Sequence, residues 1–384
     1  MTTEPKVITI ASAIPSTSPC SGSPSVRASA VPMRERCGDL KNYWYAAAEA
    51  RHVNAKKPLS MVIMETRIVL WRNAQNQAVA LRDRCLHRNT FLSPGDITDQ
   101  GIKCPYHGWT FDDQGVCVNV PSEGENGKAY PNRKVESFPT QEAYGLIWVW
   151  MGGGEPDPER QPFPMPHYDE AGWNTYYMKT HFDNGVTSLV ENFMDVPHTV
   201  FVHKGWFRDR KKLKVDSTVE RTANSVLVTY HAQDSIGFTE RVLNPKGLPM
   251  QHTDKFYMPN NTRVDYIYGA DERGFVITST CTPINEHEST VFTLISYKFG
   301  WANAVFRTFL PWYTRQVIQQ DVEIMANQGK SFKEQGPDFK STPADTLHVF
   351  IESLREHAQS NGCDAQGLPV PAPKPMTRDV VFWI

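Results

Sequence analysis

The sequence predicts an α+β protein, in which a small all-β domain precedes a larger domain built from an antiparallel sheet and helices. Two observations predict this order. From Asn42 to Met151 the chain consists of short β-like runs separated by turn residues. Beyond them lie longer runs of alternating apolar and polar residues, and then two stretches with helical periodicity. The chain has 384 residues, so it is long enough for two domains, or for one domain with a large insertion.

The first 36 residues form a segment of different composition. They are rich in Ser, Ala and Pro and show no sustained periodicity, which predicts a disordered tail over residues 1–36. The alternative is an organelle transit peptide, which would be rich in Ser and poor in acidic residues. Glu4 and the small number of arginines favour the tail. We therefore expect a cytoplasmic protein, with organelle import as the alternative.

The predicted all-β domain covers residues 37–155, and the second domain takes the remainder, residues 156–384. The turn sequence Asp112-Asp113-Gln114-Gly115 separates two of the strand-sized runs of the first domain. Gly152-Gly153-Gly154 and the Pro-rich segment Pro156–Pro166 together predict a linker. The expected strands of the first domain are Met61–Met64, Ile68–Trp71, Ala78–Leu81, Ile102–Lys103, Thr110–Phe111 and Leu146–Met151.

In the second domain a helical stretch, Ser188–His203, precedes the expected strands. After the strands, Trp312–Gln328 is amphipathic. A last helix, Asp345–His357, follows Thr342 as cap and Pro343 at the first helical position. The runs with two-residue periodicity, which predict an antiparallel sheet, are Val226–Tyr230, Arg263–Tyr268, Phe275–Thr280 and Ser289–Tyr297.

Composition argues against several classes of protein. With 40% hydrophobic and 21% charged residues, the chain resembles ordinary globular proteins. The formal net charge of −2 gives no electrostatic reason to expect nucleic acid or an anionic membrane as a partner. No apolar run approaches the ~18 to 20 residues that span a bilayer. Seven cysteines are too few and too scattered for a disulfide scaffold. Two of them stand close to histidines, which suggests metal ligation in a reducing compartment.

Cysteine and histidine occur together in two short motifs, Cys85-Leu86-His87 and Cys104-Pro105-Tyr106-His107. Each motif offers one thiolate and one imidazole within a tight turn, so two loops can hold one site. Structural zinc uses the same donor atoms, but its motifs favour a pair of cysteines or a pair of histidines in each half. Mixed halves instead suit a cluster in which two cysteines ligate one iron and two histidines ligate the other.

With the residues that follow them, the two motifs read Cys85-Leu86-His87-Arg88 and Cys104-Pro105-Tyr106-His107-Gly108-Trp109, and they resemble the cluster-binding loops of Rieske proteins. The resemblance implies a [2Fe–2S] cluster with the cysteines on one iron and the histidines on the other. Imidazole ligands give such clusters potentials of roughly −150 to +300 mV, which suits acceptance of electrons from a reductase. Trp109 is expected either to shield the cluster or to pack inside the small β domain.

A second set of candidate ligands lies in the helical stretch. His198 and His203 are so spaced that a regular helix would place them about 140° apart around its axis. They can converge on one ion only if the helix ends or distorts between them, and Pro197 favours such a distortion. Asp195 lies about one helical turn before His198, so the two side chains share a face and can form a hydrogen bond.

Two histidines and one carboxylate make the triad that leaves positions open for O₂ and substrate on non-haem iron. Asp321 is our candidate carboxylate, because it falls within the apolar stripe of the predicted helix Trp312–Gln328, whereas Glu323 points the opposite way. A carboxylate on a buried face is unfavourable unless it is paired or bound to metal. The apolar residues of that stripe are Val317, Ile318, Ile324 and Met325.

The pattern Asn192-x-x-Asp195-x-x-His198-x₄-His203, followed by the Gln-Gln-Asp321 helix, is similar to the catalytic iron site of Rieske oxygenases. The resemblance covers the chain from the start of the first strand region to its end. It implies a helix-grip catalytic domain in which a mononuclear Fe(II) is ligated by His198, His203 and Asp321. It also implies catalytic roles for Asp195 and Asn192.

In this family, the acid that matches Asp195 bridges the cluster histidine of a neighbouring subunit to an iron ligand. Here the bridge would link His107 of one chain to His198 of the next. The chemistry is sensible, because a carboxylate can accept hydrogen bonds from both imidazoles and orient them. The resemblance therefore implies a ring-shaped homotrimer.

The expected function is that of a Rieske oxygenase of the monooxygenase branch, which includes demethylases and the pheophorbide-oxygenase-like group. Electrons from NAD(P)H would reach the cluster through a separate reductase or ferredoxin, and O₂ would be used to hydroxylate or oxidatively demethylate a small organic substrate. One alternative is cis-dihydroxylation of an aromatic ring. Another, from a different class, is pure electron transfer by a Rieske protein, against which the second candidate site argues. The side chains do not identify the substrate.

Overall fold

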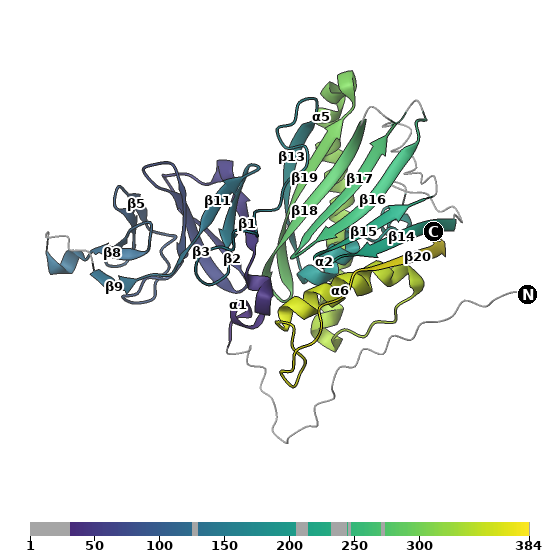
Figure 1. The fold of residues 1–384 in the computed structure, drawn as a ribbon. Helices are drawn as coiled ribbons and strands as arrows, with labels where there is room; N and C mark the ends of the chain where they lie inside the picture. The colour runs from purple at the N-terminus through teal and green to yellow at the C-terminus, as the bar shows by residue number, and fades with distance from the viewer. Residues whose placement is uncertain are drawn as a thin grey trace, which may run out of the picture.

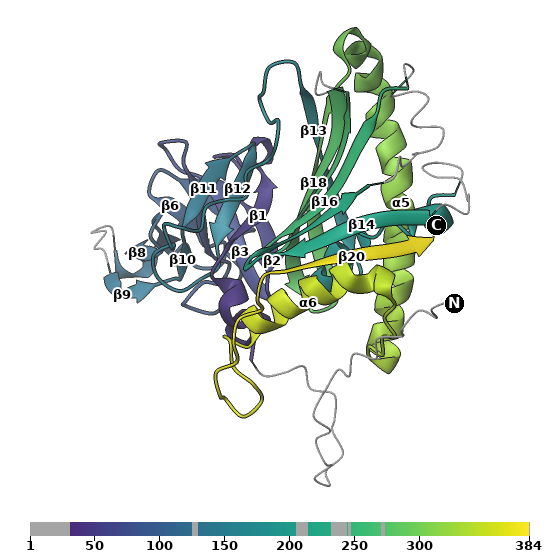
Figure 2. The ribbon, with the colours of Figure 1, turned by 45° about the vertical axis from the view of Figure 1, so that its right-hand side comes forward.

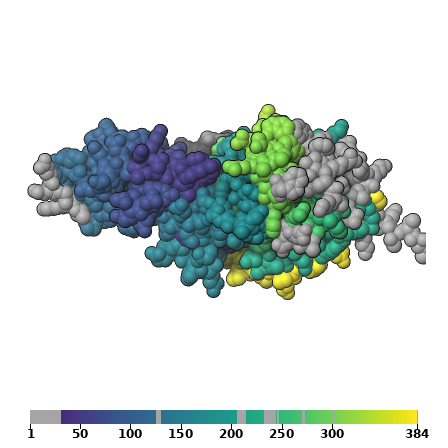
Figure 3. Space-filling model, turned by 90° about the horizontal axis from the view of Figure 1, so that it is seen from above, coloured from purple at the N-terminus to yellow at the C-terminus, as the bar shows by residue number. Residues whose placement is uncertain are grey.

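The computed structural model describes residues 31–124, 130–204, 214–231, 244, 247–269 and 273–383. Figures 1 and 2 show a small β domain beside a larger domain in which helices pack against one twisted sheet. The space-filling view in Figure 3 shows that the two domains are in contact and that the molecule is elongated. Within the described ranges, the helices are all too short or too polar to cross a membrane.

The small domain consists of three antiparallel sheets, with strand orders β1-β12-β11, β10-β4-β3-β2 and β5-β6-β7-β8-β9. The two Cys/His motifs lie in loops next to the third sheet, one before β5 and the other between β6 and β7. The strands are β1 Trp44–Glu49, β2 Leu59–Ile63, β3 Thr66–Arg72, β4 Ala78–Arg82, β5 Asp96–Thr98, β6 Gly101–Lys103, β7 Thr110–Phe111, β8 Val116–Asn119, β9 Tyr130–Lys134, β10 Ser137–Phe138, β11 Thr140–Ala143 and β12 Leu146–Trp150.

The larger domain is built on an eight-stranded antiparallel sheet with the order β13-β19-β18-β17-β16-β15-β14-β20. Along Ser225–Tyr230, half-buried and buried side chains alternate, and such alternation fixes the register between neighbouring strands. The strands are β13 Asn174–Phe182, β14 Lys214–Arg221, β15 Ser225–Tyr230, β16 Met250–Tyr257, β17 Asn261–Tyr268, β18 Arg273–Asn285, β19 Glu288–Lys298 and β20 Met376–Trp383.

Helices cover one face of this sheet. Buried side chains of α2 and α6, among them Leu189 and Ile351, share a core with Val226 and Phe256 of the sheet. The long helix α5 runs the length of the sheet behind its strands (Figure 2). This is the predicted α+β arrangement, in which an antiparallel sheet grips helices on one face. The helices are α1 Met33–Arg36, α2 Val186–Asn192, α3 Thr199–Val202, α5 Asn303–Gln335 and α6 Thr346–Gln359.

Backbone hydrogen bonds join the two domains. The turn between β2 and β3 consists of Met64 and Glu65, which both have positive φ values, 50° and 59°. Residues other than glycine rarely adopt such values, so the turn carries strain. The two amides donate to the carbonyls of Pro283 and Ile284 at the end of β18, at 2.8 and 2.7 Å. These hydrogen bonds compensate the strain and hold the two domains together at this joint, the contact between the β2–β3 turn and the end of β18.

Helix α1 corrects the prediction of a disordered tail over residues 1–36. Arg34 of this helix donates a hydrogen bond to the Met151 carbonyl at 2.6 Å and pairs with Glu136 at 2.5 Å. The last residues of the predicted tail are therefore part of the folded small domain. The rest of that prediction concerns residues 1–30, which lie outside the described ranges.

Two of the predicted helices differ from the structure. The stretch Ser188–His203 forms two short helices, α2 and α3, with an irregular segment between them. Helix α5 extends beyond Trp312–Gln328 in both directions, and Pro311 lies inside it. The predicted last helix is confirmed as α6, which follows the 3-10 turn Pro343–Asp345 with Thr342 as its cap.

Candidate metal centres

The two Cys/His motifs adopt the same backbone conformation. Cys85 N donates to the Thr90 carbonyl at 2.8 Å, and Cys104 N donates in the same way to the Trp109 carbonyl at 2.8 Å. A return hydrogen bond reaches each cysteine carbonyl, from Asn89 N at 3.0 Å and from Gly108 N at 3.1 Å. Asn89 and Gly108 have positive φ values of 61° and 72°, as this loop shape requires. Two equivalent loops therefore present one cysteine and one histidine each.

The cysteines are buried, His87 is half-buried and His107 is exposed. The rings of His87 and His107 approach to 4.5 Å between centroids, with 65° between their planes. His87 Nδ1 is buried and, among the described residues, has no hydrogen-bond partner. A buried donor atom of this kind is normally satisfied, so its position fits a metal ligand.

The chemistry of the thiols also fits a metal. Burial raises the pKa of Cys85 to about 11, and the neighbouring Cys104 adds to the rise. Thiols ligate metals as thiolates, so the buried Cys85 thiol requires a nearby cation to become charged. Trp109 packs against the small-domain core, which was one of its two expected positions, and it also stacks on the His87 ring with 4.9 Å between ring centroids.

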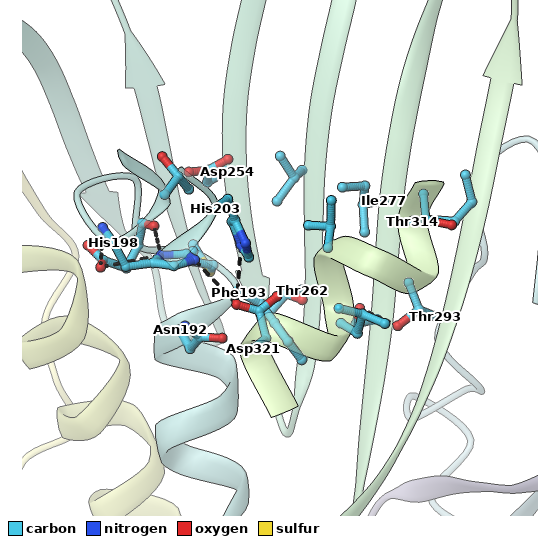
Figure 4. A pocket seen from close by; sticks show the side chains of 18 of the residues that line it. Asn192, Phe193, His198, His203, Asp254, Thr262, Ile277, Thr293, Thr314 and Asp321 are labelled. Carbon is cyan, nitrogen blue, oxygen red and sulfur yellow. Dashed lines mark hydrogen bonds and ion pairs between the residues drawn. The ribbon is translucent and has the colours of Figure 1, made fainter. Parts of the chain in front are cut away.

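The second set of candidate ligands converges in the larger domain. His198 and His203 are the cap residues of the single-turn helix α3, and their rings lie 5.2 Å apart. Asp321, in the middle of α5, places Oδ1 3.6 Å from His198 Nε2 and 3.2 Å from His203 Nε2. The ligand atoms of all three residues lie within 4.8 Å of one another. Figure 4 shows that the three side chains point toward one another. The expected distortion around Pro197 is confirmed, because α2 ends at Asn192 and α3 begins at Thr199.

Each imidazole is oriented through its other nitrogen. His198 Nδ1 lies 3.4 Å from Asp195 Oδ2 and also contacts the Asp195 carbonyl, while the His198 amide donates to Asp195 Oδ2 at 3.0 Å. His203 Nδ1 lies 3.0 Å from Gln320 Oε1. When Nδ1 carries the proton in both rings, each Nε2 lone pair faces the Asp321 side of the site. Gln320 was not among the predicted site residues.

Opposite charges dominate the electrostatics of this cluster. Burial acts to lower the pKa of His198, but hydrogen bonds with Asp195 and Asp321 outweigh it and raise the pKa to about 9. Burial acts to raise the pKa of Asp321, but the two imidazoles lower it below its usual value. The carboxylate is therefore charged, and it attracts a positive charge to the space between the three ligands.

Packing against the loop after β13 positions Asp321. The Asn184 side chain donates to the Met325 carbonyl and to Gln328 Oε1, both at 2.9 Å. At Gly329 a side chain would place its Cβ 2.1 Å from the Asp183 carbonyl, so glycine permits this close approach. As predicted from the helical stripe, Asp321 is buried (5% exposed) and Glu323 is exposed. Ile324 was wrongly placed in that stripe, since it is 41% exposed.

A pocket opens beside these three residues, between the sheet and the helices. Its cavity volume is about 120 Å³, and the pocket continues into a mouth that is open to solvent. Asn192 lines it and is buried, and Asn192 Oδ1 has no hydrogen-bond partner among the described residues. Most of the other lining side chains are apolar, including Met178, Phe193, Val264, Phe275, Ile277, Ile295, Val317 and Ile318.

Comparison with known proteins matches each of the two domains to a family model. Residues 43–139 match the family model of the Rieske [2Fe-2S] domain, and residues 183–353 match that of the vanillate O-demethylase oxygenase C-terminal domain. A Rieske domain followed by such an oxygenase domain defines the class of Rieske oxygenases. The chain belongs to this family of non-haem iron proteins.

Several relatives carry names from this family. The chain is 37% identical over 169 residues to a putative toluene-4-sulfonate monooxygenase iron-sulfur subunit of Comamonas testosteroni, covering 43% of this chain and 46% of that protein. It is 35% identical to the oxygenase component of dicamba O-demethylase of Stenotrophomonas maltophilia, covering 43% of this chain and 48% of that protein. The chain thus spans about half the length of the curated relatives it matches.

Solved structures show the same fold. Pseudomonas putida NdmA with caffeine superposes with a TM-score of 0.72 at 20% identity, over 88% of this chain and 97% of that one. Dicamba monooxygenase bound to dicamba superposes with a TM-score of 0.69 at 23% identity, over 83% of this chain and 98% of that one.

Proposed function

We propose that the protein is a monooxygenase that uses O₂ and electrons to hydroxylate or oxidatively demethylate a small organic molecule. One observation carries this proposal: His198, His203 and Asp321 converge at the wall of a largely apolar internal pocket. Two histidines and one carboxylate, with positions left open for O₂ and substrate, are the donor set of non-haem iron oxygenases. The relatives named as a monooxygenase subunit and an O-demethylase support the same reaction type.

In this proposal, Cys85 and Cys104 would hold one iron of a [2Fe–2S] cluster, and His87 and His107 would hold the other. His87 Nδ1 supports this assignment, because it is buried and has no hydrogen-bond partner within the part of the chain that the structure describes. The cluster would accept electrons that originate from NAD(P)H and arrive through a separate reductase or ferredoxin. Exposure of the loop at His107 and Tyr106 supports delivery by a partner protein, because the donor can approach closely there.

His198, His203 and Asp321 would hold a mononuclear Fe(II), which when bound supplies the site where O₂ is activated. The two imidazoles present Nε2 to that position because Asp195 and Gln320 hold their Nδ1 atoms. The apolar pocket wall excludes water and places the substrate beside the three ligands. We assign Asn192 a catalytic role, because its buried side-chain oxygen faces this pocket without a partner among the described residues.

We further propose a homotrimer in which the electron passes between subunits. Figure 1 places the third small-domain sheet, with its Cys/His loops, at the end of the molecule away from the large sheet. A route within one chain would therefore be long. Asp195 is oriented toward His198 Nδ1 and could at the same time accept a hydrogen bond from His107 of a neighbouring chain.

Metal analysis tests the proposal. Purified protein should be brown and contain about three irons per chain, two with acid-labile sulfide, and the reduced form should give an EPR signal of the Rieske type. A colourless protein with zinc would refute it. Protein with the cluster but no further iron would favour the rival function, electron transfer alone. Labelled O₂ separates the alternatives that remain, since a monooxygenase inserts one oxygen atom into the product and a cis-dihydroxylating enzyme inserts two.

A further inference from the structure

The sheet wall of the pocket carries a carboxylate that is not one of the proposed iron ligands. Asp254 lies in β16, is 2% exposed and lines the pocket. In the view of Figure 4 it lies at the same end of the pocket as His203. Strand register places it in a row of aliphatic residues that crosses the sheet: Val228, Val264, Ile277 and Ile295.

Two buried side chains support this carboxylate. Tyr230 donates its hydroxyl to Asp254 Oδ2 at 2.8 Å, and His252 Nε2 lies 2.9 Å from Oδ1. The His252 ring is stacked between Tyr230 and Tyr266, with 4.4 Å between ring centroids on each side. The carboxylate is thus held in one orientation. Each of its oxygens accepts one hydrogen bond from these residues and can accept another from a ligand.

The sheet does not require a carboxylate at this position. A valine at this position would continue the aliphatic row, whereas a buried carboxylate is unfavourable unless it is hydrogen-bonded. The charged residues around the pocket also indicate a role in ligand binding. The described residues that line it include Asp195, Asp254 and Asp321 but no lysine or arginine. Asp195 and Asp321 are paired with the imidazoles of the proposed iron site, so Asp254 is the carboxylate that an anionic group of the substrate would meet, in a weakly polar space where repulsion is stronger than in water.

We propose that Asp254 selects substrates that present an N–H or O–H donor and are uncharged or cationic, and that it disfavours carboxylates and sulfonates. The inference rests on the proposed function, because it takes the substrate to lie in the pocket beside the iron ligands. When a pocket contains a fixed, buried acceptor, an analogue that lacks the hydrogen-bond donor binds much more weakly, because the acceptor then stays unpaired. The expected substrates therefore differ in charge from the toluene-4-sulfonate named for one relative.

Binding of matched compounds tests this selectivity. Toluene-4-sulfonamide and toluene-4-sulfonate share their ring and differ in whether the sulfonyl group carries an N–H donor or a negative charge. A second pair is 4-methoxybenzyl alcohol and 4-methoxybenzoate. Calorimetric titration of the full-length protein should show that each donor compound binds at least about tenfold more tightly than its acid. Equal or reversed affinities in the unmutated protein, or no measurable binding of either donor compound, would overturn the inference.

Two variants connect the selectivity to Asp254. Asp254→Asn keeps the size of the side chain but removes its charge and presents an N–H₂ group, so the preference should fall below about threefold. The matched control is Asp265→Asn. Asp265 is also buried, but it lies in β17 on the other face of the sheet, where it pairs with Lys255 and Arg263 at 2.6 Å each. This control should keep the preference of the unmutated protein.

The titration also separates this inference from the proposed function, because binding requires no turnover and the iron content is measured on the same samples. Protein that holds all its iron but binds the acids as tightly as the donors would contradict the role of Asp254 alone. Protein without the mononuclear iron would contradict the proposed function, whatever its binding preference. An Asp254→Asn protein that folds and keeps the full preference would show that Tyr230, His252 and Asp254 only stabilise the sheet.

Discussion

Replacing Asp321 by asparagine tests the proposed mononuclear site directly. The change keeps the size of the side chain but removes the negative charge that faces His198 and His203. Burial acts to lower the pKa of His198, yet Asp195 and Asp321 raise it from 6.5 to about 9. Such a rise corresponds to about 3 kcal/mol of interaction with a single positive charge.

The expected loss of iron affinity follows from this value. If Asp321 supplies half of the interaction, and the ion carries twice the charge of an imidazolium, the carboxylate contributes about 3 kcal/mol to metal binding, or on the order of 100-fold in the dissociation constant. The assay is anaerobic Fe(II) titration of protein from which the mononuclear iron has been removed. The absorbance of the [2Fe–2S] cluster should stay unchanged, because the two centres share no ligands.

Glu323 is the matched control for this experiment. It lies in the same helix, but its side chain is exposed and accepts a hydrogen bond from Gln319 at 3.2 Å. Glu323→Gln should bind Fe(II) as the unmutated protein does. The assignment of the helix face would be refuted if Asp321→Asn kept its affinity within about threefold, or if Glu323→Gln lost it.

Three further predictions follow from the contacts around the site. Asp195→Asn should fold and keep its cluster but lose product formation by about 100-fold or more, and mixed oligomers with His107→Ala chains should regain activity; no rescue in verified mixed oligomers would contradict the route between subunits. Gln320→Leu should weaken Fe(II) binding by about 10- to 100-fold, because His203 loses the partner of its Nδ1, and the same titration would show it. Burial raises the pKa of Glu191 to about 8, so the folded chain keeps a proton that the unfolded chain releases, and the free energy of unfolding should fall by about 4 kcal/mol between pH 4.5 and pH 8. Urea unfolding at both pH values should show this fall in the unmutated protein and a flatter profile in Glu191→Gln.

The sequence predicted those strands in which polar and apolar residues alternate, such as β17 and β19. It missed β16, because this strand carries His252 and Asp254 on its buried face, where alternation would require apolar residues. It also missed β20, whose side chains are mostly exposed at the edge of the sheet. Polar residues that serve a pocket and exposed edge positions both resemble a loop when only the sequence is available.

Spacing along the chain predicted several residues of the site, whereas contacts between residues distant in the sequence could not be predicted. The stripe of α5 predicted that Asp321 would be buried, although the buried positions run through Thr314, Asp321 and Met325 and leave Ile324 outside. The contact of Gln320 with His203 could not be predicted, because a glutamine beside a ligand has no periodicity or spacing of its own. Asp254 likewise becomes notable only when neighbouring strands place it in an aliphatic row.

The joint between the domains limits how parts of this protein can be exchanged with those of relatives. A graft of the small domain that was cut only at the segment 152–166 would import a foreign turn in place of Met64 and Glu65. Unless that turn also adopted two positive φ values, its amides would miss the carbonyls of Pro283 and Ile284. A working chimaera should therefore carry the end of the β18–β19 hairpin together with the donor domain, so the exchangeable module includes residues from both sides of the boundary.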